Sequence, residues 1–144
     1  MDETMKQAIF SQVASEPFAQ KFGIKLVELK AGYSRVEMSF TPDMKNIFGM
    51  AHGGAIFALI DTAFETACNS HGTVAVALNV TVNYLAAASP GAKLIAEAQE
   101  VNLTRKTGNY DIRVKEESGQ VIAVCQALAY RKGVPLPFIQ ASDS

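Results

Sequence analysis

The chain has 144 residues, 49% of them hydrophobic and 19% charged, and a formal net charge of -1. This composition is typical of a globular protein rather than a disordered one, and the length fits a single domain over residues 1–144. A near-neutral charge leaves no basic patch for nucleic acid and no cationic face for a membrane surface.

The first half of the chain predicts helices at both ends with strands between them. Met5, Ile9 and Val13 recur at helical spacing, which predicts an amphipathic helix over residues 2–15. From Gly53 to about Ser70 the sequence reads as one long helix that is apolar on nearly every face, and such helices are usually buried. The other expected elements are a short helix at 17–22, strands at 24–30 and 33–40, a turn at 31–32 and a loop at 43–51.

The second half predicts four strands with short connections, which implies an antiparallel sheet. The strands are expected at 74–84, 93–103, 110–115 and 121–131, with turns at 89–91 and 118–119 and a loop at 105–109. The tail over 132–144 is expected to be irregular because it carries Pro135 and Pro137. One long apolar helix needs a strongly curved sheet around it, so the fold class is α+β with a single central helix.

Asp61 places a carboxylate inside this apolar helix, where burial is costly unless the charge is paired or lies in a polar cavity. The helix begins with Gly53 and Gly54, which let another group approach free backbone N–H donors at the positive end of the helix dipole. Close packing of the helix start against a strand is the other interpretation of these glycines. A helix start that stabilises an anion, followed by a carboxylate, favours acyl chemistry.

The pattern Asn46-x-x-Gly49-x-x-His52-Gly53-Gly54, with Asp61 nine residues after the histidine, resembles the hotdog-fold acyl-CoA thioesterases. The resemblance is greatest to their phenylacetate-degradation (PaaI-like) branch and runs from about residue 17 to 131. It implies a hotdog fold, in which a curved antiparallel sheet wraps around one long central helix. It also implies hydrolysis of an acyl-CoA, whose acyl group could be aromatic, short-chain or medium-chain.

The resemblance also implies roles for individual residues. Asp61 would act as general base or nucleophile, the Gly53 N–H would polarise the thioester carbonyl, and Asn46 would contact substrate or water. His52 would lead into the oxyanion turn, as a helix-entry residue more than as a base. Relatives often hold the attacking water with a Ser or Thr after the helix, where this chain has an alanine. Asn79 and Thr81 are the candidates to replace it.

Other residues have a functional and a structural interpretation. Arg105 and Lys106 could bind the phosphates of CoA, although exposed loop cations are more often solvated. Phe48, with Met50 and Phe57, could line an acyl pocket, although core packing is the default for such residues. Two further residues are interpreted structurally: Glu65 as a surface charge or member of a polar cluster, and His71 as a favourable charge at the helix end.

Spacing along the helix predicts a site shared between subunits. Gly53 and Asp61 are eight residues apart, or about 12 Å along the axis. A base must lie within about 3 Å of its proton, directly or through one water, so the two groups of one chain cannot attend the same carbonyl. Antiparallel pairing of two central helices would solve this, so we expect a dimer. The resemblance adds that such dimers commonly pair into tetramers.

The remaining expectations concern cofactors and location. Two distant histidines make no metal site, and no cofactor is expected, because coenzyme A enters as part of the substrate. Cys68 and Cys125 lack metal-ligand spacing and are expected to be small buried side chains in a reducing cytosol. The chain starts with acidic residues and no apolar run, so we expect a cytoplasmic protein without a signal peptide or a membrane partner.

Two alternatives stay open at this point. A hotdog enoyl-CoA hydratase or dehydratase would usually pair a histidine with an acid at another spacing, and an enoyl-CoA hydration assay would separate it. A non-catalytic acyl-CoA-binding module would keep the pocket but would not need a charge at position 61. Tight CoA binding without turnover would favour it.

Overall fold

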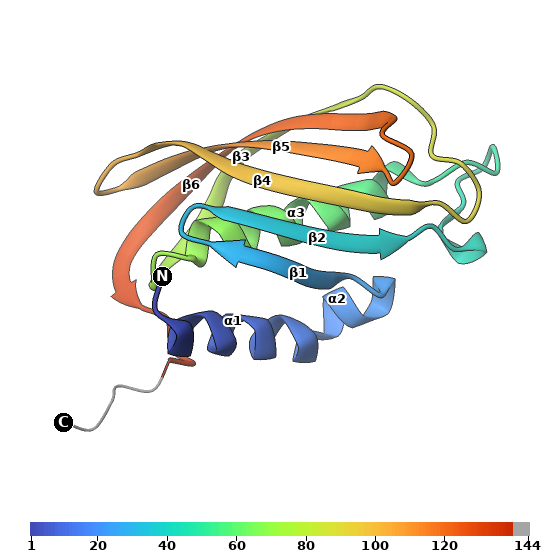
Figure 1. The fold of residues 1–144 in the computed structure, drawn as a ribbon. Helices are drawn as coiled ribbons and strands as arrows, with labels where there is room; N and C mark the ends of the chain where they lie inside the picture. The colour runs from blue at the N-terminus through green and yellow to red at the C-terminus, as the bar shows by residue number, and fades with distance from the viewer. Residues whose placement is uncertain (140–144) are drawn as a thin grey trace.

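Helix α3 (Gly53–Asn69) lies in the hollow of a curved six-stranded sheet in the computed structural model, which describes residues 1–139 (Figure 1). All strand pairs are antiparallel, and the strand order across the sheet is β1-β2-β4-β5-β6-β3. The strands are β1 (Lys25–Lys30), β2 (Tyr33–Ser39), β3 (Thr73–Tyr84), β4 (Lys93–Leu103), β5 (Thr107–Glu116) and β6 (Val121–Pro135). The predicted α+β class with one central helix is confirmed.

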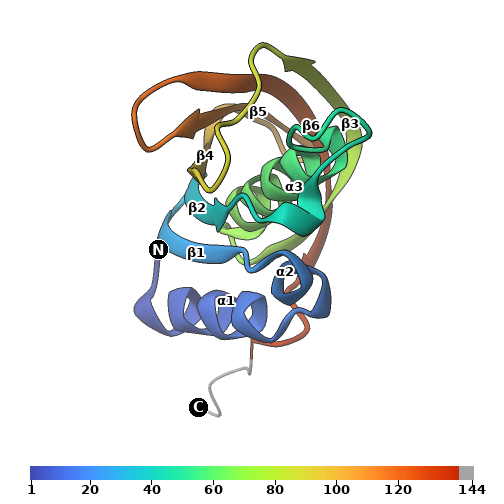
Figure 2. The same cartoon turned by 90° about the vertical axis from the view of Figure 1, so that its right-hand side faces the viewer.

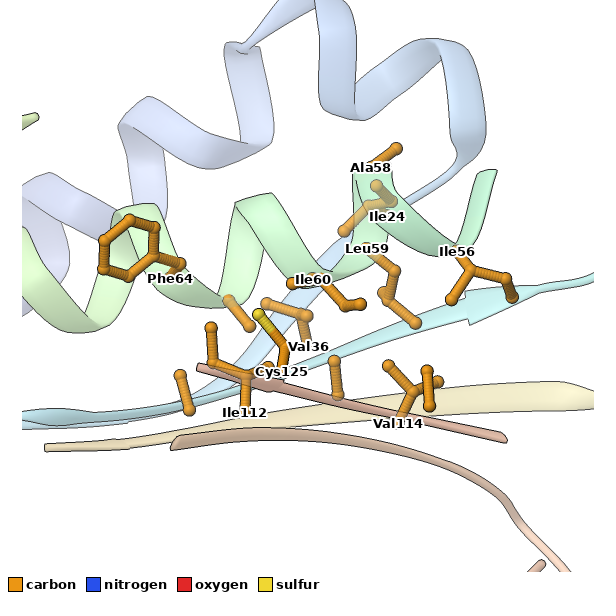
Figure 3. Packing of buried hydrophobic residues seen from close by; sticks show 14 of the residues in the cluster. Ile24, Val36, Ile56, Ala58, Leu59, Ile60, Phe64, Ile112, Val114 and Cys125 are labelled. Atoms are coloured by element: carbon orange, nitrogen blue, oxygen red, sulfur yellow. The ribbon is translucent and has the colours of Figure 1, made fainter. Parts of the chain in front are cut away.

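The sheet curves because its concave face must cover an apolar helix. Leu59, Ile60 and Phe64 of α3 are almost fully buried, and Leu59 and Ile60 point toward the sheet (Figure 3). The Phe64 ring packs edge-on against Tyr110 of β5, with 5.6 Å between the ring centroids. These helix residues also meet inward-facing strand residues such as Val36. The buried hydroxyls of the helix, which would otherwise be costly, donate to backbone carbonyls of the preceding turn. Together these contacts fix the orientation of α3 in the sheet.

Two N-terminal helices, α1 (Glu3–Ser15) and α2 (Pro17–Phe22), pack on the β1 side of the molecule (Figure 2). A short 3-10 helix, η1 (Pro42–Met44), precedes the loop that leads into α3. Ile9 and Val13 of α1 form a second apolar cluster with Leu29 and Leu136. Glu16 lies at the junction of α1 and α2. It is close enough to the central helix for its charge to act on Asp61.

The predicted irregular tail over 132–144 is wrong for its first residues, because β6 continues to Pro135. Thr73 pairs with Pro135, and the Leu136 N–H then donates to the Gly72 carbonyl at 3.1 Å. Pairing with β3 thus resumes at Pro135 after an irregularity between Thr73 and Ala75. Residues 140–144 lie outside the described part of the chain.

The loop predicted at 105–109 is also shorter than expected, because β5 begins at Thr107. The hairpin closes early since the Thr104 N–H donates to the Thr107 carbonyl at 2.8 Å and the Thr107 N–H donates to the Thr104 hydroxyl at 2.9 Å. Arg105 and Lys106 therefore occupy the tip of a tight hairpin.

Strand β3 forms a free edge of the sheet and carries an irregularity in its pairing between Ala77 and Asn79. The extra residue breaks the simple alternation that the sequence predicts. Val80 and Val82 face the core, whereas Val76 and Leu78 are 39% and 58% exposed. An unpaired strand edge with exposed apolar side chains is a natural place for another strand to add.

Candidate active site

The start of α3 is held by two polar side chains of the preceding segment. Asn46 Oδ1 accepts from the backbone N–H groups of Phe48 and Met50, at 2.9 and 3.1 Å. His52 is the N-cap of the helix, and its Nδ1 accepts from the Gly54 N–H at 2.8 Å. His52 thus takes the helix-entry role, and Asn46 fixes the loop that delivers it.

The backbone N–H groups of the two glycines at the start of α3 differ in whether they have a hydrogen-bond partner. The Gly54 N–H is occupied by His52, and a Cβ on Gly54 would lie 3.0 Å from the imidazole, so close packing explains this glycine. The Gly53 N–H, by contrast, takes part in none of the hydrogen bonds among residues 1–139. Gly53 is partly exposed. Its N–H lies at the positive end of the helix dipole, where an oxyanion is favoured.

Asp61 lies two turns further along α3, surrounded mostly by buried apolar residues, and is itself only partly buried. Burial raises the pKa of its carboxyl above the ordinary value, and the negative charge of Glu16 raises it further. The carboxylate is therefore a better proton acceptor than an exposed aspartate. A partly buried acid with a perturbed pKa is a candidate for acid–base chemistry.

Glu65 follows one turn after Asp61. Glu16, Asp61 and Glu65 form an acidic cluster. Although the Glu65 side chain is partly exposed in the single chain, desolvation of its carboxyl, the charge of Glu16, a hydrogen bond with Glu16 and the charge of Asp61 together raise its pKa to about 8. The expectation that Glu65 joins a polar cluster agrees with this arrangement. The sequence did not indicate Glu16, because its neighbours predict only a break between two short helices.

The two cysteines near the cluster are free and buried. Burial raises the pKa of Cys68 to about 12 and that of Cys125 to about 11, and the nearby carboxylates add to both shifts. A thiol with so high a pKa is a poor nucleophile at neutral pH. The candidates for acid–base chemistry in this region are therefore the carboxyl groups rather than the thiols.

Comparison with known proteins identifies the family of this chain. Residues 48–123 match the family described as Thioesterase superfamily. A putative esterase of Archaeoglobus fulgidus is 42% identical over 113 residues, which cover 78% of this chain and 73% of that protein. The acyl-coenzyme A thioesterase PaaI of Escherichia coli is 36% identical over 115 residues, covering 80% of this chain and 82% of PaaI.

This chain belongs to the thioesterase superfamily. A solved structure of the E. coli PaaI protein from the phenylacetic acid degradation operon superposes on it with a TM-score of 0.88. That match has 32% sequence identity and covers 92% of this chain and 96% of the other. The chain is therefore a thioester hydrolase, and the hotdog fold expected from the resemblance is confirmed.

Asn79 and Thr81 of the thioesterase do not lie where the sequence prediction needs them. Both side chains are exposed on the outer face of the sheet, because they alternate with the core-facing Val80 and Val82, and the Thr81 hydroxyl donates to Asn79 Oδ1 at 3.0 Å. Asp61 lies on the other side, in the hollow of the sheet. Within one chain neither residue can therefore position a water at Asp61, and the core-facing positions of this stretch carry Val80 and Val82.

The hairpin tip with Arg105 and Lys106 lies far from the helix start of the same chain. The Arg131 N–H donates to the Lys106 carbonyl at 2.7 Å, and Arg131 itself pairs with Ala75 at the beginning of β3. The tip is therefore near the C-terminal end of α3, while Gly53 begins its other end (Figure 1). One chain alone does not bring these cations to Gly53.

Apolar side chains surround the start of α3. Phe48 is 75% exposed, so core packing does not explain it, and Met50 and Phe57 are also exposed. Beside them a cavity of about 320 Å³ is lined by residues that include Met50, Ile56, Tyr84 and Leu85. An apolar cavity next to an open N–H donor could receive the acyl part of a thioester.

Two observations bear on cofactors and membranes. Across residues 1–139, no three His, Cys, Asp or Glu side chains gather closely enough to hold a metal ion. No helix in that part of the chain has the length and apolar character to cross a membrane. His71, expected as a helix-end charge, lies just beyond the end of α3 with its Nε2 in hydrogen-bond contact with Glu100 Oε2 at 2.5 Å.

Proposed function

We propose that this thioesterase hydrolyses acyl-CoA to a free acid and coenzyme A, with Asp61 of one subunit and the Gly53 N–H of a second subunit at the same thioester. The observation that carries the proposal is the pairing, on one helix, of an unoccupied N–H donor at Gly53 with a partly buried Asp61 of raised pKa. Coenzyme A enters as substrate, and the proposed chemistry uses no metal or redox cofactor.

The reaction needs a base, an oxyanion donor and a leaving group. As general base, Asp61 takes a proton from water while the water oxygen attacks the thioester carbon. The negative charge that develops on the carbonyl oxygen is stabilised by the Gly53 N–H and the helix dipole. The C–S bond then breaks, and the thiolate leaves without a strong general acid. Direct attack by the Asp61 carboxylate, followed by hydrolysis of the anhydride, is the other route open to the same residue.

Three features support a shared site. Gly53 and Asp61 of one chain are about 12 Å apart along the helix, too far for one carbonyl. The edge strand β3 is unpaired and exposes Val76 and Leu78, which a second copy could cover. Antiparallel pairing would also bring the hairpin tip of one subunit, with Arg105 and Lys106, toward the helix start of the other, where it could meet the CoA phosphates. We propose a dimer on this basis, further paired into a tetramer as in related enzymes.

The acyl group would lie beside the helix start, against Phe48 and the apolar cavity near Met50. These surroundings suit an uncharged acyl group, either aromatic or of short or medium length. Turnover of a panel of acyl-CoAs, followed through the free thiol released, identifies which acyl group the enzyme prefers. The protein is proposed to act in the cytoplasm, consistent with two free buried cysteines.

Asp61→Asn tests the proposal most simply, because it keeps the shape of the side chain and removes its charge. The variant should fold and bind acyl-CoA but lose turnover by about 10²–10⁴-fold, the usual contribution of a general base. Asp111→Asn is the matched control, since Asp111 is exposed on β5. Near wild-type turnover by folded Asp61→Asn protein would show that the assignment is wrong. Hydration of an enoyl-CoA by the wild-type protein would instead favour a hydratase.

A further inference from the structure

We infer that Tyr84 is a positioning residue for the oxyanion donor at Gly53. The inference rests on the proposed function, because it assigns Tyr84 to the same N–H group. Tyr84 is the last residue of β3, 31 positions away from Gly53 in the sequence, and its hydroxyl donates to the Gly53 carbonyl at 3.1 Å. The edge strand is thereby linked directly to the first residue of the central helix.

The tyrosine ring also lies against Gly53. A Cβ placed on Gly53 would be 3.4 Å from the ring carbon that carries the hydroxyl and 3.5 Å from the hydroxyl oxygen. Ring and hydroxyl together therefore fix the position of the first helical residue. A Cβ at position 53 would thus be in van der Waals contact with the ring.

The helix start needs such support because it consists of two glycines. Glycine has the largest conformational freedom to lose and no side chain with which to anchor itself. His52 holds the following residue from the loop side through its bond to the Gly54 N–H. Tyr84 holds Gly53 from the sheet side, through its carbonyl, and leaves the N–H of Gly53 open. Two anchors on opposite sides would keep that N–H aimed at one point, which is what an oxyanion donor requires.

Core packing does not explain Tyr84, because 53% of the side chain is exposed. The rest of its surface lines the 320 Å³ cavity together with Met50 and Ile56. Burial raises the pKa of the Tyr84 hydroxyl, so it stays protonated and able to donate at neutral pH. The ring thus contacts the first residue of α3 and also lines the space proposed for the acyl group.

The two parts of the side chain can be tested separately. Tyr84→Phe removes the hydroxyl and keeps the ring, so kcat should fall about five- to tenfold, the equivalent of one neutral hydrogen bond, with KM changed less than about twofold. Tyr84→Ala removes the wall as well, so KM should also rise, most for the bulkiest acyl-CoA. Tyr33→Phe is the matched control, since the Tyr33 hydroxyl donates at 3.3 Å to Glu97 on the sheet, away from α3.

Mixed dimers show whether Tyr84 acts through Gly53. When Tyr84→Phe subunits pair with Asp61→Asn subunits, one site combines the intact Asp61 of the first with the intact Gly53 and Tyr84 of the second. That site should work at the full wild-type rate, so the defect of Tyr84→Phe should disappear from it. A site that stays slow would place the effect of Tyr84 on Asp61 of its own chain and overturn the inference.

Other outcomes also test the role of Tyr84 and separate it from the proposed function. A Tyr84→Phe protein with kcat within twofold of wild type, or one that fails to fold, would overturn the positioning role. If Asp61→Asn retains turnover, the proposed function itself fails. If Asp61→Asn is inactive while Tyr84→Phe is fully active, only the role of Tyr84 is lost.

Discussion

At the scale of single residues, we expect the acidic cluster of Glu16, Asp61 and Glu65 to set the pH dependence of turnover. The proposed mechanism needs ionised Asp61, and the pKa of its carboxyl is raised by burial and then by the charge of Glu16. Glu16→Gln removes the repulsion, which lowers the pKa of Asp61. The acid limb of the pH dependence of kcat/KM should therefore move to lower pH.

The control for this prediction is Glu117→Gln, which changes the charge equally at an exposed hairpin residue. Its pH profile should match that of the wild type. An acid limb that stays in place in Glu16→Gln, or moves to higher pH, would contradict the influence of Glu16 on Asp61.

Glu65 should make folding stability depend on pH. Its pKa is about 8 in the folded protein against an ordinary value of 4.5, so the folded state holds a proton that the unfolded state has lost. The free energy of unfolding should then fall as pH rises from about 4.5 to about 8. In Glu65→Gln this part of the decline should be absent, as measured by urea denaturation across the range. An equally steep decline in the variant would assign it to other groups.

The sequence alone indicated some residues of the candidate site but not others, for a physical reason. Asp61 and Gly53 stand out because a charge and a glycine pair interrupt an apolar helical pattern. Glu16 and Tyr84 reach the site from distant segments, and no local pattern records which side chains the fold brings to α3. The water-positioning role predicted for Asn79 and Thr81 does not hold within one chain, because the two residues alternate with Val80 and Val82, which face the core, and so lie on the outer face of the sheet.

At the scale of elements, the long helix and the succession of strands along the chain could be predicted from the sequence, whereas two strand ends could not. Residues 132–135 look irregular in sequence because of Pro135, but pairing with Thr73 keeps them in β6. Thr107 likewise joins β5 because threonine hydrogen bonds close the hairpin early. In both places a tertiary partner, invisible in the local sequence, decides where the strand ends.

The end of β6 should matter for stability through Leu136. This side chain is 4% exposed and packs with Ile9, Val13 and Leu29, which ties the C-terminal segment to α1 and β1. Leu136→Ala should lower the free energy of unfolding by about 2–5 kcal/mol, the range for a buried leucine. Val134→Ala, at a side chain that is 50% exposed, should change it by less than about 0.5 kcal/mol. Urea denaturation of both variants checks this, and equal effects would mean that Leu136 does not anchor the segment.

At the scale of the whole molecule, the free edge at β3 is the surface on which assembly should depend. Leu78→Lys places a charge on that edge, where Leu78 is 58% exposed. The variant should dissociate to monomers at concentrations where the wild type is dimeric, and it should lose activity in parallel. Sedimentation velocity measures the first and thiol release the second. Val27→Lys on β1, at the opposite edge of the sheet, is the control and should remain dimeric.

Subunit mixing tests the shared site most directly. Asp61→Asn and Gly53→Pro homodimers should each be nearly inactive, since loss of an oxyanion donor typically costs roughly 10²–10³-fold in rate. In a mixed dimer one site receives both damaged groups and the other receives both intact ones. Refolding the two variants together should therefore restore about a quarter of wild-type activity, because random mixing makes about half of the dimers mixed. If mixed dimers form and no activity returns, Gly53 and Asp61 do not meet across a subunit interface.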